Sequence, residues 1–170
     1  TKHVSLGLGW TPETGINYVL GESGTGKTTY MKALQERFLD CSVAIPQDPD
    51  SYFPPDMSVA DVFDWVSGGN PDKIGHIKEV LKRTNDNRVL KALHDTMTPI
   101  VILSRGERQR FIFALAYARV MEILSKKKEN LYFFMDEFTS AQDHSRASLM
   151  WNCITEDMFG KIKEENKEKD

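Results

Sequence analysis

Eight consecutive residues, 21–28, have the types and the spacing of a phosphate-binding loop. They read GESGTGKT, with glycine at the first and sixth positions followed by lysine and threonine. Glycines let the backbone curl so that successive N–H groups point at an anion, and the N-terminus of a helix adds partial positive charge there. In this pattern the lysine reaches the outer phosphates of a nucleotide and the threonine hydroxyl binds Mg²⁺. The predicted phosphate-binding residues are Gly21, Glu22, Ser23, Gly24, Thr25, Gly26, Lys27, Thr28 and Thr29.

Polar side chains also follow two apolar runs of strand length. Asp136 and Glu137 come directly after residues 131–135, and Gln47 comes just beyond residues 41–46. A fully apolar run suits a parallel strand that is covered on both faces. Open α/β sheets bind their ligands beyond the carboxyl ends of such strands, so we expect Asp136 and Glu137 to lie at a ligand site.

The elements around these residues predict an α/β fold. Residues 16–20 indicate a short buried strand before the glycine-rich turn, and a helix with a core-facing stripe follows Lys27. We therefore expect a P-loop NTPase core with a mostly parallel sheet flanked by helices. Helical spacing between prolines and glycines predicts a small helical subdomain at residues 56–98, inserted into a core of residues 1–55 and 99–170.

Length and composition narrow the class of protein. The chain has 170 residues, a formal net charge of −3 and two cysteines far apart, so it suggests neither a nucleic-acid-coating surface nor a disulfide framework or zinc site. No apolar run is long enough for a membrane span and no signal peptide is visible, which predicts a soluble, cytoplasmic protein.

A long helix is predicted from Glu107 to about Lys127. Its start reads Ser104-Arg105-Gly106-Glu107, in which Ser104 and Glu107 have the spacing of a capping box. Phe111, Leu115, Ala118 and Ile123 are available for one buried face of this helix. A second, shorter helix is predicted after Asp143, over residues 145–159.

Four motifs in order carry a resemblance to a known family. They are GESGTGKT at residues 21–28, Gln47 after a strand, LSRGERQR at residues 103–110 and LYFFMDEFTSAQD at residues 131–143. Together they resemble the nucleotide-binding domain of the ABC ATPase superfamily, and they span nearly the whole chain.

The resemblance implies ATP and Mg²⁺ as ligands, with residues 21–29 as the ATP-binding set. Within that set Lys27 would contact the transferred phosphate. Thr28, Gln47 and Asp136 would serve the metal ion, Asp136 largely through water. Glu137 would act as the general base that polarises the attacking water, and Gln47 would sense the γ-phosphate.

The same resemblance implies a site shared between two chains. Ser104, Arg105, Gly106 and Glu107 would face the γ-phosphate bound by a neighbouring subunit, and Asp143 would lie at the same interface. The implied partners are a second ABC ATPase chain, in a homodimer or a heterodimer, and a protein or nucleic acid on which the closing pair acts.

Several positions depart from the family pattern. Arg105 replaces a glycine, Glu107 replaces the glutamine common in transporters and Phe138 replaces a proline. The family's switch histidine would follow one further strand, which the sequence up to Asp170 does not contain, so the chain resembles a compact form; His144 is expected to be an ordinary helix-start residue. The short interval between Lys27 and Gln47 favours a compact ATPase that is not a transporter subunit.

Three functions stay open at this point. The favoured one is an ABC-type ATPase whose ATP-dependent dimerisation drives a conformational change in a protein or nucleic-acid partner. The second is the nucleotide-binding subunit of an ABC membrane transporter, which would require a membrane subunit as partner. The third is an ATP-dependent assembly module that does not hydrolyse ATP.

Overall fold

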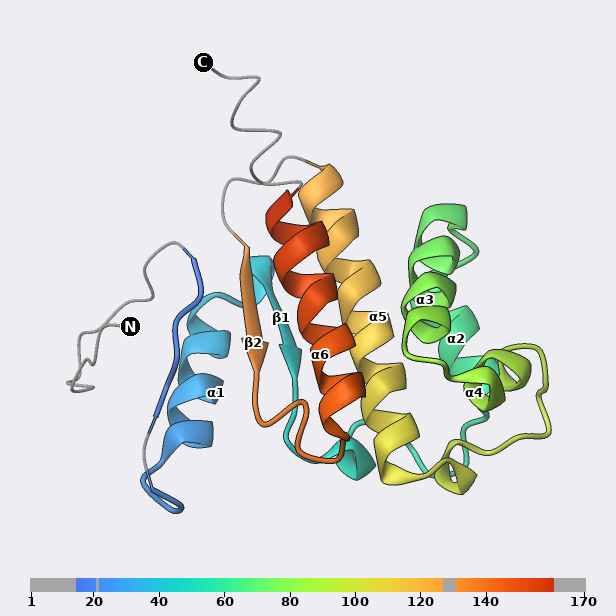
Figure 1. Ribbon diagram of the computed structural model, residues 1–170, viewed down its shortest axis with the longest axis horizontal. Coiled ribbons are helices and arrows are strands. Elements are labelled where there is room, and N and C mark those ends of the chain that lie inside the picture. The colour runs from blue at the N-terminus through green and yellow to red at the C-terminus, as the bar shows by residue number, and fades with distance from the viewer. Residues whose placement is uncertain (1–14, 21, 127–130, 161–170) are drawn as a thin grey trace.

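The computed structural model describes residues 15–20, 22–126 and 131–160 of the chain. Within these ranges the chain is mostly helical and contains two short strands (Figure 1). No helix among the described residues is both long enough and apolar enough to cross a membrane. The elements in chain order are α1 (Lys27–Arg37), η1 (Leu39–Cys41), β1 (Ser42–Ile45), η2 (Pro49–Ser51), α2 (Val59–Ser67), α3 (Pro71–Arg83), α4 (Asn87–Ala92), η3 (Ile100–Ile102), α5 (Arg105–Ser125), β2 (Tyr132–Met135), α6 (His144–Asn152) and the π-helical turn η4 (Cys153–Met158).

Strands β1 and β2 form a parallel pair at the centre of the molecule. Ser42 lies opposite Tyr132 and Ile45 lies opposite Met135, so both strands end at the same edge of the sheet. The backbone N–H of Asp136 donates to the carbonyl of Ile45 at 3.1 Å and extends the ladder by one bond. Helix α1 lies on one side of this pair, and α5 and α6 lie on the other (Figure 1).

The predicted fold class is wrong as stated, because a mostly parallel sheet of several strands is not present in the described residues. Residues 16–20, predicted as a buried strand, form no strand, and the side chains of Ile16, Tyr18 and Leu20 are 42 %, 59 % and 67 % exposed. An apolar run becomes a strand only where a neighbour supplies partners for its backbone N–H and C=O groups. Here the described residues pair only β1 with β2.

The helices expected within residues 56–98 are confirmed as α2, α3 and α4. Helix α2 begins after Ser58, whose hydroxyl accepts from the N–H of Asp61 at 3.0 Å while the Asp61 carboxylate accepts from the Ser58 N–H at 3.2 Å. This reciprocal capping satisfies two donors that a helix start otherwise leaves unpaired. Helix α3 packs along α5, and its residues Ile77, Val80 and Leu81 are buried in the core. The division into a core and a helical subdomain stays a prediction.

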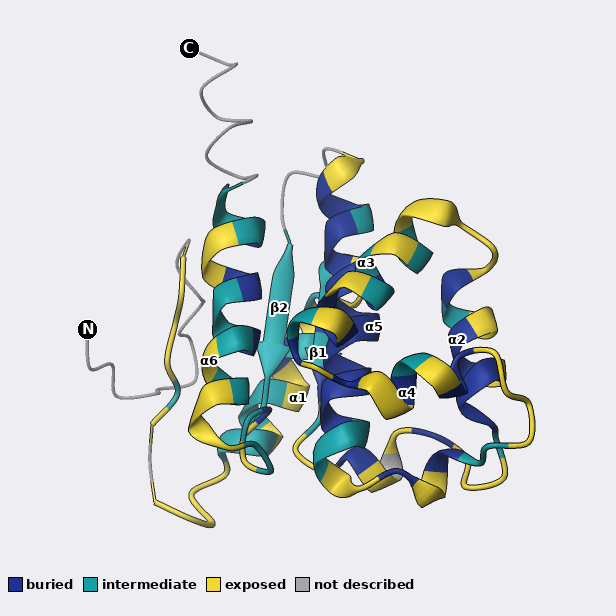
Figure 2. Ribbon diagram, turned by 45° about the vertical axis from the view of Figure 1, so that its right-hand side comes forward, coloured by how far each residue is buried: buried dark blue, intermediate teal, exposed yellow. Residues whose placement is uncertain are grey.

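Helix α5 is buried on nearly all sides, which differs from the single buried face that the sequence predicts. Every residue from 109 to 118 is buried, and the dark blue of α5 in Figure 2 shows this. The reason is its place in the molecule, since α3 covers one side while the strands and α6 cover the other. A helix enclosed in this way has room for apolar side chains in all directions.

A charged cluster on α5 joins this helix to α3. The carboxylate of Glu122 lies 2.9 Å from the Lys73 ammonium, 2.6 Å from Arg119 and 2.7 Å from Lys126. The hydrogen bond from Lys126 and those from Lys73 and Arg119 outweigh the opposing effect of burial, and they lower the pKa of Glu122 to about 2. The charged form of Glu122 is therefore favoured by folding.

We expect Glu122 to contribute to stability only while it is ionised. Its pKa falls on folding from an ordinary 4.5 to about 2, so its contribution is complete above pH 4.5 and is lost as the pH falls toward 2. The free energy of unfolding of the wild type should exceed that of Glu122→Gln at neutral pH, and the two should converge at the acid end. Urea unfolding of both proteins across this range measures the difference. A difference that does not change with pH would contradict this assignment.

Candidate functional site

The glycine-rich loop folds back on itself in front of α1. Gly24 and Gly26 have φ values of +80° and +86°, which lie in the left-handed region that glycine adopts without strain. The carbonyl of Glu22 accepts from the Thr25 hydroxyl at 2.9 Å and from the Lys27 ammonium at 2.8 Å. The loop is therefore closed by its own polar side chains.

Helix α1 starts at this loop without a side-chain cap. Its N-cap residue is Gly26, which has no side chain that could accept from the first backbone N–H groups of the helix. Such N–H groups and the helix dipole together favour an anion. Glu22, Ser23, Thr25 and Thr29 are exposed around this helix start. The remaining predicted loop residue, Gly21, lies outside the described residues.

Two hydrogen bonds join the predicted residues at the carboxyl edge of the sheet. The Thr28 hydroxyl donates to the Asp136 carboxylate at 2.6 Å, and the Gln47 amide donates to the Glu137 carboxylate at 2.8 Å. Thr28 is the second residue of α1, Gln47 follows β1, and the two acids follow β2. The structure thus brings three distant segments of the chain to one place.

This cluster offers oxygen atoms that suit a magnesium ion. The Thr28 hydroxyl and the Asp136 carboxylate are hard donors, and Mg²⁺ typically takes one or two such ligands together with water and phosphate oxygens. The donor set therefore fits the metal role assigned to Thr28 and Asp136. Across residues 15–20, 22–126 and 131–160, no three or more His, Cys, Asp or Glu side chains gather in a cluster that could hold a metal ion.

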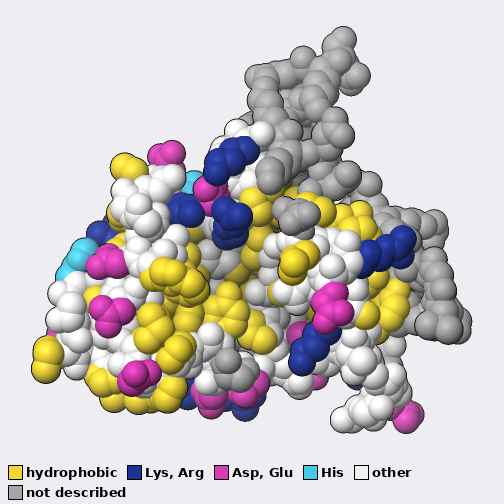
Figure 3. All heavy atoms as spheres, turned by 180° about the vertical axis from the view of Figure 1, so that it is seen from behind, with side chains coloured by type: hydrophobic (Ala, Val, Ile, Leu, Met, Phe, Trp, Pro, Cys, Tyr) yellow, Lys and Arg dark blue, Asp and Glu magenta, His cyan; other side chains and the backbone are white. Residues whose placement is uncertain are grey.

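A groove with a volume of about 560 Å³ opens beside the cluster. Thr28, Gln47 and Asp136 line one end of it, and the four residues of β1 line its length between α1 and α5. Figure 3, a view from behind, shows hydrophobic side chains around a hollow on this face. Residues 22–27 of the glycine-rich loop do not line the groove, so the groove adjoins the predicted phosphate site without being it.

Glu137 has a backbone conformation that is unusual for its type. Its φ is +47°, in the left-handed region that side chains other than glycine, asparagine and aspartate rarely adopt. The N–H of Ser140 donates to the Glu137 carbonyl at 2.9 Å and closes a turn over residues 137–140. Phe138 anchors this turn in the core. The centroid of its ring lies 5.8 Å from the ring centroid of Phe113 and 5.1 Å from that of Trp151. Such a conformation persists only where the surroundings hold it in place.

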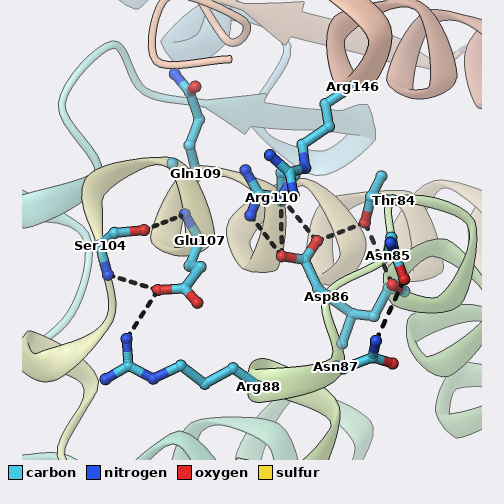
Figure 4. Close-up of polar contacts among 12 residues, drawn as sticks. Thr84, Asn85, Asp86, Asn87, Arg88, Ser104, Glu107, Gln109, Arg110 and Arg146 are labelled. Carbon is cyan, nitrogen blue, oxygen red and sulfur yellow. Dashed lines mark hydrogen bonds and ion pairs between the residues drawn. The ribbon is translucent and has the colours of Figure 1, made fainter. Parts of the chain in front are cut away.

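The segment 104–107 forms the first turn of α5. The predicted capping box is confirmed, since the Glu107 carboxylate accepts from the Ser104 N–H at 2.7 Å and the Ser104 hydroxyl accepts from the Glu107 N–H at 3.3 Å (Figure 4). Burial raises the pKa of Glu107, but hydrogen bonds to Ser104 and the nearby Arg88 leave it below its ordinary value. Ser104 and Arg105 are exposed. No hydrogen bond links them to the Thr28–Asp136 cluster among the residues described.

Asp143, predicted at a dimer interface, caps the next helix. Its carboxylate accepts from the Arg146 N–H at 2.9 Å and forms an ion pair with the Arg146 guanidinium at 2.9 Å. The backbone hydrogen bond, and then the side chain of Arg146, hold the pKa of Asp143 below its ordinary value. Helix α6 begins at the next residue, His144, as expected. Asp143 is exposed, and its role between two chains stays a prediction.

Four residues near this region have no individually predicted role, namely Asp86, Gln109, Arg110 and Gln142. Gln109 and Arg110 are buried in α5, where Arg110 donates to the buried carboxylate of Asp86 at 2.5 to 2.9 Å (Figure 4). Arg110 also donates to the side-chain amide oxygen of Gln142 at 2.6 Å. The sequence does carry one signal for Gln109 and Arg110, since both are polar residues at the start of a helical run that is otherwise mostly apolar. Buried charged and amide groups require partners, but the sequence does not show which ones.

Comparison of this chain with models of protein families, with curated proteins and with solved structures finds no match.

Gly106 lies where α5 packs against the turn after Glu137. A Cβ atom at this position would lie 3.0 Å from the Ala141 carbonyl oxygen and 3.1 Å from the Arg110 guanidinium. The Gly106 carbonyl also accepts from the Gln142 amide at 3.1 Å. The absence of a side chain at this position thus allows the two segments to touch.

We expect Gly106→Ala to be about 1–3 kcal/mol less favourable for stability than the same change at an open helical glycine, because the added methyl group would press on the Ala141 carbonyl and oppose the gain in helix propensity. Gly75→Ala is the matched control. Gly75 lies inside α3 with nothing within 4 Å of the added carbon, so the change should stabilise the protein by about 0.5–1 kcal/mol through helix propensity. Urea unfolding measures both. Equal effects of the two substitutions would show that the close approach at Gly106 does not matter.

Proposed function

We propose that this chain is an ABC-type ATPase that binds and hydrolyses Mg-ATP and pairs with a second chain when ATP is bound. The observation that carries the proposal is the meeting of Thr28, Asp136, Gln47 and Glu137 at the carboxyl edge of β1 and β2. This edge lies directly beside the uncapped start of α1. Anion binding, metal ligands and a carboxylate base are thereby available in one place.

The residues have distinct roles in the proposed reaction. The N–H groups at the start of α1 and the Lys27 ammonium would bind the phosphates of ATP. Thr28 and Asp136 would hold Mg²⁺, which neutralises charge on the phosphates. Glu137 is an exposed carboxylate next to this pair and would orient and accept a proton from the attacking water. The Gln47 amide, bonded to Glu137, would help to place that carboxylate.

The start of α5 is the surface proposed to meet the second chain. Ser104 and Arg105 are exposed there, and the N-terminus of α5 carries partial positive charge. A phosphate held by another copy would find a hydroxyl, a guanidinium and this helix start on one surface. The paired chains would then transmit the binding and loss of ATP to a protein or nucleic-acid partner.

The solution mass of the Glu137→Gln chain tests both parts of the proposal. Without nucleotide the chain should have a mass near 19.4 kDa, and with Mg-ATP it should have twice that mass, because slow hydrolysis traps the pair. Phosphate release should fall by about 10²–10⁴ relative to the wild type, as is typical for the loss of a general base. Light scattering and a phosphate assay provide the two measurements.

Matched variants at the two ends of α5 complete this test. Adding Ser104→Arg to the Glu137→Gln chain should abolish pairing, because a long cation then blocks the contact surface. Adding Ser125→Arg, at the exposed far end of the same helix, should leave pairing intact. Pairing that survives Ser104→Arg would rule out the 104–107 segment as the contact. A wild type that neither binds ATP nor releases phosphate would rule out the ATPase itself.

A further inference from the structure

One buried amide, that of Gln109, connects α5 to the turn that follows Glu137. Gln109 is 1 % exposed. Its amide nitrogen donates to the Glu137 carbonyl at 3.2 Å and to the Ser140 hydroxyl at 3.4 Å. Its oxygen accepts from the Ala141 N–H at 3.2 Å and from the Gln142 amide at 2.9 Å. Both ends of one side chain are therefore committed to residues 137–142.

Gln109 faces a different part of the structure from its neighbours on α5. In Figure 4 its side chain points away from the Ser104–Glu107 pair and from the Arg110–Asp86 fork. Arg110 also reaches the same turn, through the Gln142 amide oxygen at 2.6 Å. The turn is thus held by two adjacent residues of a helix that is itself fixed in the core.

Gln109 contacts Glu137 only at its backbone carbonyl, so the Glu137 carboxylate stays available for chemistry. The carbonyl of Glu137 accepts from both Gln109 and Ser140, while its side chain accepts from Gln47. Because the left-handed φ of +47° at Glu137 is unfavourable, the turn would relax without these bonds. A relaxed backbone would change the direction of the Glu137 carboxylate relative to the Gln47 amide that now donates to it.

We propose that Gln109 is a positioning residue for hydrolysis, which sets the direction of the Glu137 carboxylate by fixing the backbone of residues 137–142. This inference rests on the proposed ATPase function. In this role Gln109 does not contact the nucleotide. Substituting Gln109 should therefore change the rate of the chemical step and not the binding of ATP.

Gln109→Met tests the inference, because methionine fills a similar volume without polar atoms. With Mg-ATP we expect kcat to fall by about ten- to a hundredfold, as for a displaced catalytic group, while KM for ATP stays the same. In the absence of nucleotide, the Ala141 amide should exchange its hydrogen roughly tenfold faster by NMR, since its acceptor is lost. The second measurement does not depend on hydrolysis.

Two further variants separate positioning from general destabilisation. Tyr117→Phe removes another buried hydrogen bond of α5, the 3.1 Å bond to Asp157, and should leave kcat unchanged. Gln109→Asn keeps an amide but is too short to bridge Glu137 and Ala141, so it should reproduce the loss of kcat if the methionine variant does not fold.

The outcomes distinguish this inference from the proposed function. An unchanged kcat in both Gln109 variants, a change in KM alone, or an equal loss in Tyr117→Phe would overturn the role of Gln109 while leaving the ATPase in place. A wild type without phosphate release would overturn the ATPase, and the positioning role would fall with it.

Discussion

A buried helix cannot carry polar side chains without partners, and α5 carries two of them, Gln109 and Arg110, in its buried part. Their partners come from elsewhere in the chain, namely Asp86 at the start of α4 and the turn of residues 137–142. The hydrogen bonds that Gln109 and Arg110 need therefore determine where the turn lies relative to α5. Because Glu137 belongs to that turn, the position of the proposed general base depends on the burial of α5.

The short parallel sheet provides the second constraint. Since β1 and β2 end in register, the residues that follow them have to leave the sheet at the same edge. This places Gln47 near Glu137, and it places Asp136 within reach of Thr28 at the start of α1. Two strands are sufficient for this convergence, because each of the interacting side chains lies within two residues of a strand end or a helix start.

Local signals in the sequence were reliable where the physical cause was itself local. The capping box predicted at Ser104 is present, and α5 starts at the next residue, because such a cap requires only a carboxylate three residues further along the chain. The same reasoning failed for residues 16–20. Their apolar composition suits a strand, but the formation of a strand depends on a neighbouring chain segment, which no local pattern reveals.

The sequence by itself determined the chemical types of the candidate site: the glycine loop with Lys27 and Thr28, the carboxylates Asp136 and Glu137, and the helix start at Ser104. It determined these because each depends on neighbours within a few residues. Only the tertiary structure decided the small size of the described sheet, the burial of α5 on nearly all sides and the four bonds of Gln109. These features join residues separated by about thirty positions or more along the chain, and the packing of a core selects such partners by shape and unmet hydrogen bonds rather than by local pattern.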